Sequence, residues 1–380
     1  MVQKLSIGLV LSGGGVRAAA FHAGVLKYLA ERDMLKEVVH VSSVSGGSLF
    51  TGMVFKQKGY RWPTSSEYLS EFLPSFRKLL TQRSLQGSAV LRLLMPWNWR
   101  FLLSRGNVIA QSLEKVWGVT ASLNQLAAHP LWSINCTAGE TGRRFRFKDK
   151  TMGDYELGYA KLRDFKLAKA MAISAAFPGG IGPLVIDPTK FSWEKSADWN
   201  ARKPESVSLP YSKLHLYDGG VYDNLGLEPM FDMGKQQLKN DTSLPSPVNY
   251  LLVSDGGAPF TRAPIPHQLH PYRFKRLMDI AMDQTRNLRV RAFVSYLMGG
   301  PNRGGFLGIG AVPKESIARF TKSRRELGAQ LLGETWLSAQ ECKRAASIRT
   351  TLARMREADY DLLERHGYET ARWTIELMHQ

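Results

Sequence analysis

The chain is poor in cysteine and has no long apolar run. Only two cysteines occur among 380 residues, Cys136 and Cys342, and they lie far apart in the sequence. So few cysteines exclude a disulfide framework and favour a reducing compartment, so we expect a cytoplasmic protein. No run of about 18 apolar residues is present, which argues against a transmembrane helix. No segment resembles a signal peptide.

Acidic residues are also scarce. Lys and Arg number 51 against 33 Asp and Glu, which gives a formal net charge of +18. Such a balance favours an anionic partner, which could be a phospholipid surface, a nucleic acid or a phosphorylated small molecule. A hydrophobic content of 44% indicates a folded globular protein. Internal repeats, zinc-ligand spacings and low-complexity tracts are absent from the sequence.

A glycine-rich loop follows the first predicted strand. Residues 5–11 are apolar and predict a buried strand, and residues 18–29 predict a helix with one apolar face. Bare N–H groups at the start of a helix suit an anion. Between strand and helix stand three glycines and an arginine, namely Gly13, Gly14, Gly15 and Arg17.

Three functions of this loop remain open from its residues alone. A dinucleotide-binding loop fits the G-x-G-x-x-A spacing, but the acidic residue expected after the second strand is missing. A nucleotide P-loop would need Gly-Lys-Ser or Gly-Lys-Thr after the glycines, and the sequence has neither there. The third function is an oxyanion hole that serves a nucleophile on the neighbouring loop.

Ser45 is the candidate nucleophile. Residues 38–44 predict a short buried strand, and a helical pattern begins at Gly46. A serine on such a turn, flanked by small residues, is typical of a nucleophile elbow, which leaves its Oγ exposed. The usual pattern is G-x-S-x-G, and here Ser43 replaces the first glycine while Gly47 provides the second. An ordinary strand-to-helix turn is the alternative interpretation.

Two Asp-Gly-Gly sequences offer a carboxylate partner. Asp218 follows a predicted strand at 214–217 and precedes Gly219 and Gly220, whereas Asp255 follows a later strand. Both cannot serve one serine, so we expect the other to be a structural turn.

Residues 60–118 are predicted to form a basic helical insertion. No acidic residue occurs in the range 72–113, where arginines alternate with leucines and aromatic residues. Trp97 and Trp99 follow Pro96, which breaks a regular helix. Basic residues beside Trp and Leu suit a helix in a membrane interface, and a core helical insertion with solvated charges is the alternative.

The remaining segments are expected to contain both strands and helices. We predict strands at 131–137 and 143–147, an alanine-rich helix at 167–176, a long helix at 273–298, a glycine-rich loop at 302–313, and two or three surface helices in 315–380.

Taken in order, four stretches resemble the motifs of the patatin-like phospholipases. Gly13–Arg17 resembles the glycine-rich oxyanion motif, and Ser43–Gly47 resembles the nucleophile elbow. The other two are a strand pair, Ile134–Thr137 with Glu140 and Phe147, and Asp218–Gly220 preceded by Ser174–Pro178. The resemblance extends from Leu5 to about Phe260. Ala18 and Ser43 stand where the family usually has glycine, and both are small.

This resemblance implies a three-layer α/β fold with a mainly parallel central sheet flanked by helices. Residues 1–260 would form the catalytic domain, and 261–380 a helical C-terminal portion packed on it. It also implies a lipid acyl hydrolase that cleaves acyl esters of membrane glycerophospholipids. The enzyme would use a Ser–Asp dyad and would need no metal or other cofactor.

The resemblance also assigns roles to single residues. Ser45 would attack the ester carbonyl, and Asp218 would take its proton. Asp218 is preferred to Asp255 because it follows the 174–178 segment at the family's usual distance. The oxyanion-hole amides would belong to Gly13, Gly14, Gly15 and Gly46, and the motif-supporting residues would be Arg17, Gly47, Gly219 and Gly220.

Other functions stay open beside this one. A Ser-His-Asp α/β-hydrolase would need a late histidine, such as His267 or His270, within reach of Ser45. A non-catalytic basic module that binds a phosphate or a nucleotide would also use the charge and the glycine loop. Some bacterial relatives are anti-phage effectors that a cyclic nucleotide activates.

We therefore expect a phospholipid membrane surface as the partner, met at the inner membrane face. A cyclic nucleotide activator and a homo-oligomer are further expectations. We expect no nucleic acid polymer as a partner.

Overall fold

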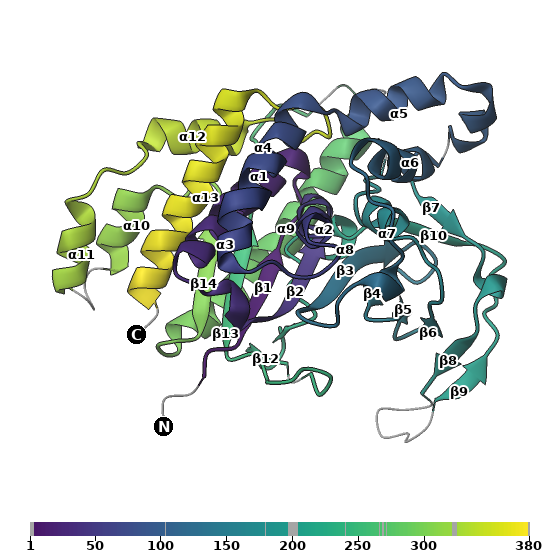
Figure 1. The fold of residues 1–380 in the computed structure, drawn as a ribbon, viewed down its shortest axis with the longest axis horizontal. Coiled ribbons are helices and arrows are strands. Elements are labelled where there is room, and N and C mark those ends of the chain that lie inside the picture. The colour runs from purple at the N-terminus through teal and green to yellow at the C-terminus, as the bar shows by residue number, and fades with distance from the viewer. Residues whose placement is uncertain are drawn as a thin grey trace.

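The computed structural model describes residues 4–102, 104–178, 180–196, 204–239, 241–265, 267, 270, 272–320 and 325–378. Its main feature is a twelve-stranded sheet with helices on both faces (Figure 1). The strands at the centre of this sheet are parallel. The predicted α/β class with a mainly parallel central sheet flanked by helices is confirmed.

Five neighbouring parallel strands form the centre, in the order β14-β13-β1-β2-β3. They are β1 (Ile7–Leu11), β2 (Val38–Val44), β3 (Leu131–Ala138), β13 (Tyr250–Asp255) and β14 (Gly304–Gly308). All residues of β1, β3 and β13 are buried, as expected for strands covered on both faces. Because the carboxyl ends of parallel strands meet at one edge, the loops after β1, β2 and β13 lie together.

Beyond β3 the sheet continues with antiparallel strands. These are β4 (Arg144–Lys148), β5 (Thr151–Asp154), β6 (Gly158–Lys161), β8 (Trp193–Lys195) and β9 (Glu205–Val207). The strand β10 (Leu214–Asp218) pairs antiparallel with β3 and with β7 (Leu184–Ile186). A separate pair is formed by β11 (Phe231–Asp232) and β12 (Gln237–Leu238). The pairing of β10 with β3 brings Asp218 opposite Cys136, beside the loop that follows β2.

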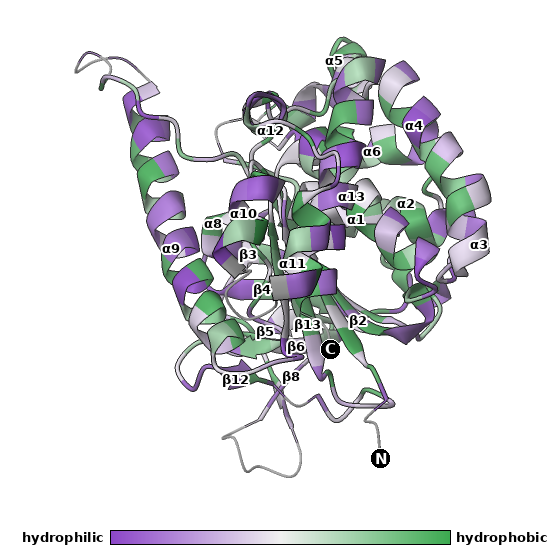
Figure 2. Cartoon of the chain, turned by 90° about the vertical axis from the view of Figure 1, so that its left-hand side faces the viewer, coloured by the Kyte–Doolittle hydropathy of each residue, from purple (hydrophilic) through white to green (hydrophobic). Residues whose placement is uncertain are grey.

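One face of the sheet is covered by α1 (Gly15–Glu31), α2 (Gly46–Gln57) and α13 (Glu357–Met378) (Figure 2). Two glycines let α1 and α13 pack closely. A Cβ atom at Gly24 would lie 1.8 Å from the Glu364 carbonyl oxygen, and one at Gly367 would lie 2.0 Å from that of Phe21. The prediction of a surface helix is therefore wrong for α13, whose inner face is buried against α1.

The opposite face is covered by α9 (Tyr272–Met298), together with the short helix α8 (Gly220–Asp223). Near its end, α9 buries Phe293 and Leu297 against Val10 and Val253 of the sheet. The rest of α9 is largely exposed, so this helix is attached mainly through its second half.

The predicted glycine-rich loop at 302–313 is wrong, because it contains β14. A Cβ atom at Gly304 would lie 1.9 Å from the Leu251 carbonyl oxygen, so glycine is needed there for close approach of the two strands. The C-terminal portion thus adds a strand to the central sheet. Its remaining helices are α10 (Pro313–Phe320), α11 (Arg325–Leu332) and α12 (Ala339–Ser347).

Residues 60–118 are mainly helical, as predicted. They contain α3 (Ser65–Glu67), a π-helical turn η2 (Tyr68–Phe72), α4 (Leu73–Gln82), α5 (Leu85–Leu93), a 3₁₀ turn η3 (Pro96–Phe101) and α6 (Gly106–Val116). The other helical segments are η1 (Leu35–Glu37), η4 (Leu123–Gln125), α7 (Leu167–Ser174) and η5 (Pro188–Lys190). In the described part of the chain, no helix combines the length and the apolar composition needed to cross a membrane.

Candidate active site

Ser45 stands on a strained turn between β2 and α2. Its backbone has φ +49° and ψ −115°, a region that residues with a side chain rarely adopt. The amide of Gly47, in the first turn of α2, donates to the carbonyl of Ser12 in the loop that follows β1. A sharp strand–turn–helix of this kind is the geometry of a nucleophile elbow, as the sequence predicted.

The glycine-rich loop lies directly against the elbow. A Cβ atom at Gly46 would lie 2.2 Å from the carbonyl oxygen and 2.7 Å from the amide nitrogen of Gly15. A Cβ atom at Gly13 would lie 3.2 Å from the Cβ of Ser45. Glycine at these positions therefore permits two backbone loops to meet beside the serine hydroxyl.

Of the four glycines expected to supply oxyanion donors, Gly13 has an amide that is already used. That amide donates to the Asn224 carbonyl at 3.0 Å, so it does not fit the role. The amides of Gly14, Gly15 and Gly46 remain as the candidate donors. Gly14 has φ +142° and Gly15 has φ +63°, so the chain turns sharply there, and Gly46 is the first residue of α2.

Asp218 is buried beside Ser45. The Gly220 amide donates a hydrogen bond to its carboxylate at 2.7 Å. The Ser45 hydroxyl lies beside the same carboxylate, and hydrogen bonding from it lowers the pKa of Asp218. Burial raises the pKa of Asp218 to about 7, although these two hydrogen bonds oppose the rise. Among the described residues no ion pair neutralises this carboxylate. It is therefore a buried carboxylate that titrates near neutral pH.

The two glycines after Asp218 lie in crowded places. A Cβ atom at Gly219 would lie 2.4 Å from the Asn135 carbonyl oxygen. One at Gly220 would lie 3.0 Å from the Asp218 carboxylate itself. The Asp-Gly-Gly sequence thus lets β3 and the start of α8 approach the carboxylate on both sides.

Asp255 has a different environment. It is also buried, but Nε of Arg286 on α9 donates to it at 2.7 Å, and the Gly257 amide donates at 2.9 Å. The Arg286 guanidinium therefore neutralises Asp255. This pairing agrees with the expectation that the second Asp-Gly-Gly sequence is a structural turn.

Arg17 supports the glycine-rich loop from within the protein. Its guanidinium is 1% exposed and donates to the carbonyl oxygens of Gly256 and Ile348. The loop is thereby joined both to the end of β13 and to the segment that follows α12. A side chain so deeply buried does not face a lipid phosphate.

Ser174, the last residue of α7, connects the elbow to the Asp218 loop. Its hydroxyl accepts a hydrogen bond from the Ser45 amide at 3.0 Å and donates to the Asn135 carbonyl at 2.7 Å. Its own carbonyl accepts from the Gly219 amide at 3.3 Å. One residue thus fixes the backbone beside both side chains of the candidate site.

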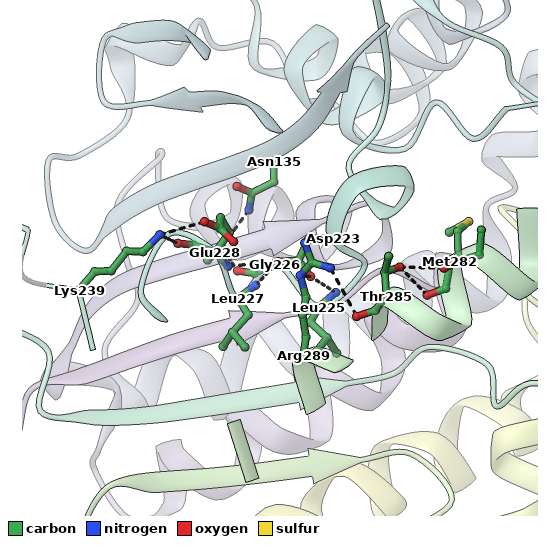
Figure 3. A network of polar contacts seen from close by, with 12 residues as sticks. Asn135, Asp223, Leu225, Gly226, Leu227, Glu228, Lys239, Met282, Thr285 and Arg289 are labelled. Atoms are coloured by element: carbon green, nitrogen blue, oxygen red, sulfur yellow. Dashed lines mark hydrogen bonds and ion pairs between the residues drawn. The ribbon is translucent and has the colours of Figure 1, made fainter. Parts of the chain in front are cut away.

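A polar network behind the site holds the loop that follows Asp218 (Figure 3). Asp223 accepts hydrogen bonds from the amides of Leu225, Leu227 and Glu228. Nε of Arg289 on α9 lies 3.4 Å from the same carboxylate. Arg286 and Arg289, about one turn apart, therefore fasten α9 to two loops that border the site.

The histidines considered for a triad lie elsewhere. His267 and His270 are exposed in the segment that leads into α9. His22 is buried, but its ring contacts the Ser254 hydroxyl and the Ser12 carbonyl, and burial lowers its pKa to about 4. Among the residues that the structure describes, Asp218 is the titratable group whose pKa is affected by the Ser45 hydroxyl.

No three His, Cys, Asp or Glu side chains of the described residues cluster as metal ligands do. That the reaction needs no cofactor stays a prediction.

Sequence reasoning did not assign roles to Ser174, Asn224 or Arg286. Ser174 was noted only as part of a motif, although a lone hydroxyl ending an alanine-rich helix is a usable signal. Asn224 lies between the loops: its side-chain oxygen would be 2.3 Å from a Cβ at Gly13 and 2.7 Å from one at Gly220. The pairing of Arg286 with Asp255 has no local sequence signal.

The chain is similar to known proteins in sequence and in fold. The family profile described as patatin-like phospholipase matches residues 9–231, more than half of the chain. A comparison with curated protein sequences found no match.

Solved structures were also compared. The human GIVD cytosolic phospholipase A2 has 15% sequence identity and a TM-score of 0.51, and the match covers 98% of this chain and 59% of that one. VipD from Legionella pneumophila is matched at 13% identity and a TM-score of 0.37, over 97% of this chain and 66% of that one. The chain therefore spans less than two thirds of the length of these proteins. The similarity to the human protein shows that the two share a fold. The match to the family profile shows that the chain belongs to the patatin-like phospholipase family.

Proposed function

We propose that the protein hydrolyses acyl esters of membrane glycerophospholipids with Ser45 as nucleophile and Asp218 as general base. The observation that carries this proposal is the position of the Ser45 hydroxyl beside a buried carboxylate that has no cationic partner among the described residues. A carboxylate with a pKa near 7 is a strong enough base to assist at neutral pH, where about half of it is ionised.

In the first half of the reaction, the Ser45 Oγ attacks the ester carbonyl as Asp218 takes the hydroxyl proton. The oxyanion that forms is held by the amides of Gly14, Gly15 and Gly46, at the start of α1 and α2. Removing one such donor typically costs about 10²–10³ in rate. Asp218 then returns the proton to the leaving alcohol, which departs as a lysophospholipid.

In the second half, a water molecule releases the acyl group. Asp218, again ionised, takes a proton from the water while the water oxygen attacks the acyl-serine carbonyl. The same amides hold the second oxyanion. Ser45 regains its proton from Asp218, and a free fatty acid leaves, which restores the starting state.

The choice of glycerophospholipids rests on family membership and on charge. The names of the family and of the similar human protein both refer to phospholipases. A net charge of +18 favours an anionic surface on which such lipids are found. Head-group preference and acyl position are open to measurement.

Lipid mass spectrometry tests the proposal. Wild type and Ser45→Ala are added to mixed phospholipid vesicles, and we expect free fatty acid and lysophospholipid with wild type alone. Ser70→Ala is a matched control, because the Ser70 side chain on η2 is exposed and its hydroxyl bonds only the Ser66 carbonyl in the described structure. Equal product with wild type and Ser45→Ala would contradict the proposal.

A fluorophosphonate ester separates this enzyme from a non-catalytic binding module. An activated serine forms a stable adduct with such a probe, and an ordinary turn serine does not. We expect labelling at Ser45 in wild type. Absence of labelling in a protein that binds phosphorylated ligands would favour the module.

Activation by a cyclic nucleotide stays a prediction, as does a homo-oligomer. The C-terminal range 271–380 supports the first, because its 19 Lys and Arg against 12 Asp and Glu would attract an anionic activator. Calorimetry with cyclic di- and trinucleotides tests it. If no heat of binding and no gain in lipid hydrolysis are measured, the prediction of a cyclic nucleotide activator is refuted.

A further inference from the structure

The insertion exposes a row of large apolar side chains that has no counterpart to pack against within the described chain. We call this row the α5–η3 ridge. Its members are Leu91, Leu94, Met95, Trp97, Trp99 and Leu102. Trp97 is 68% exposed and Trp99 is 57% exposed. Such exposure is unusual, because large aromatic side chains stabilise a protein most when they are buried. Leu85 and Ala89 on the same helix are buried. One face of α5 therefore packs against the protein, and the other face is exposed.

The ridge is held in a fixed shape by a buried asparagine between the two tryptophans. Asn98 is 2% exposed, and its side-chain amide donates to the Arg92 carbonyl at 2.9 Å. Its side-chain oxygen accepts from the Gln111 side chain of α6 at 3.3 Å. These bonds fasten η3 to α5 and α6. Trp97 and Trp99 are therefore presented to the outside by an ordered turn.

Positive charge accompanies these apolar side chains. Arg100 and Arg105 are exposed, and the range 72–113 contains no acidic residue. Among the described residues, neither arginine forms an ion pair. Apolar side chains rimmed by unpaired cations match an anionic lipid surface, where tryptophans lie at the head-group level. A solvated protein surface would instead mix both signs of charge.

One end of the ridge is joined to the glycine-rich loop. At the start of α5, the Gln86 amide donates to the Leu352 carbonyl, and its side chain accepts from the Thr351 hydroxyl. The Thr351 carbonyl in turn accepts from the Val16 amide, directly after the glycines. Two hydrogen-bonded steps therefore connect α5 to the candidate oxyanion loop.

The other end is joined to the segment that holds Asp218. The Ser104 hydroxyl donates to the Pro183 carbonyl at 2.8 Å, and Nη1 of Arg105 donates to the Gly180 carbonyl at 3.2 Å. A few residues earlier, the Ala176 carbonyl accepts from the Asp218 amide at 3.0 Å. The segments on both sides of the ridge are thus connected to segments that hold the candidate site, and Figure 2 shows α5 at the upper end of the molecule.

We propose that the α5–η3 ridge is the surface by which the protein docks on an anionic phospholipid bilayer. Trp97 and Trp99 enter the head-group region, and Arg100 and Arg105 contact lipid phosphates. The docked bilayer then lies over Ser45. This inference rests on the proposed function for its purpose, since docking delivers the ester, but the docking itself needs no catalysis.

Vesicle co-sedimentation tests the docking in a catalytically silent Ser45→Ala protein. Vesicles of phosphatidylcholine alone are compared with vesicles that also contain phosphatidylglycerol. We expect binding to the anionic vesicles that weakens as salt is added. Adding Trp97→Ser with Trp99→Ser should lower the partition coefficient at least about tenfold. Arg100→Gln should lower it about fivefold.

Matched controls come from the turns between the antiparallel strands β4, β5 and β6. Tyr155, on the turn after β5, is 56% exposed, so Tyr155→Ser removes an exposed aromatic residue away from the ridge. Lys150→Gln removes an exposed cation between β4 and β5. Both should bind anionic vesicles as the parent does. Equal binding by the ridge variants and the controls would overturn the proposal.

Hydrolysis measurements distinguish failure of docking from failure of the proposed function. With Ser45 restored, the double tryptophan variant should hydrolyse vesicle lipid at least about tenfold more slowly. On p-nitrophenyl butyrate, a dissolved ester, it should equal wild type. Loss on both substrates would show a damaged site and contradict a docking role. A wild type inactive on both substrates would refute the hydrolase, while the Ser45→Ala binding data would still decide the docking.

A second copy of the chain is the other occupant that the test detects. Light scattering after size-exclusion chromatography gives the mass of wild type and of the double tryptophan variant without lipid. We expect the same mass for both. A wild-type dimer that the substitutions convert to a monomer, with vesicle binding unchanged, would identify an interface between copies and overturn the proposal.

Discussion

The Ser174 hydroxyl accepts a hydrogen bond from the Ser45 amide at 3.0 Å, and this bond fixes the turn on which Ser45 stands. The Ser174 carbonyl also accepts from the Gly219 amide. The relative position of hydroxyl and carboxylate thus depends on a residue that contacts neither reacting atom. We regard Ser174 as a positioning residue for the proposed dyad.

Replacement of Ser174 tests this role. Ser174→Ala leaves the partly buried Ser45 amide without its acceptor, which should cost about 1 kcal/mol of stability. We expect kcat on a dissolved ester to fall about tenfold or more with KM nearly unchanged, because misplacement affects the transition state more than binding.

Ser48→Ala is the matched control. Ser48 contacts the Ser174 hydroxyl at 2.8 Å but does not bond the Ser45 amide. A similar loss of stability with a much smaller loss of kcat is expected. Equal kinetic effects in both variants would show that Ser174 acts only through packing.

The pH dependence of hydrolysis should follow Asp218. Burial raises the pKa of this carboxyl to about 7, and only the ionised form takes the proton of Ser45. We expect kcat/KM to fall about tenfold for each unit of pH below about 7 and to level off above it. A profile flat down to pH 5 would contradict the assignment of Asp218 as the base.

Asp218 should also lower the free energy of unfolding once the pH is high enough to ionise its buried carboxyl group. A carboxyl whose pKa is raised by folding binds its proton more tightly in the folded state, so stability falls as pH rises from about 4 to about 7. Asp218→Asn removes this penalty and keeps an acceptor for the Gly220 amide.

We therefore expect Asp218→Asn to have a higher melting temperature than wild type at pH 8. At pH 4 the two proteins should melt at similar temperatures. Thermal unfolding at both pH values measures this difference. A variant that is less stable than wild type at pH 8 would show that the buried charge is compensated by contacts outside those described.

The strained backbone of Ser45 gives a prediction on stability. Glycine adopts positive φ freely, so Ser45→Gly should relieve strain that Ser45→Ala retains. We expect the glycine variant to be more stable than the alanine variant by about 1 kcal/mol, after allowance for its more flexible unfolded chain. Denaturant unfolding compares the two, and a more stable alanine variant would contradict the strain.

Local patterns in the sequence predicted much of the fold around the site. The apolar run before Gly13 and the β-branched run before Ser45 are buried strands, because parallel central strands are covered on both faces. The resemblance to the family, drawn from short motifs, is confirmed. The catalytic roles of Ser45 and Asp218 stay predictions until activity is measured.

Other features depend on contacts between distant segments. Glycines at 304 and 305 indicate a loop by composition, yet Gly304 is required by the adjacent Leu251 backbone in a strand pair. Burial of α13 depends on Gly24 in α1, more than 300 positions earlier. The Asp255–Arg286 ion pair joins two elements that no local period connects.

The turnover of Asp218→Asn on p-nitrophenyl butyrate tests the account most directly. The variant should remain folded by circular dichroism and lose about 10²–10⁴ in kcat/KM, the usual contribution of a general base. A folded Asp218→Asn protein with wild-type turnover would contradict the account.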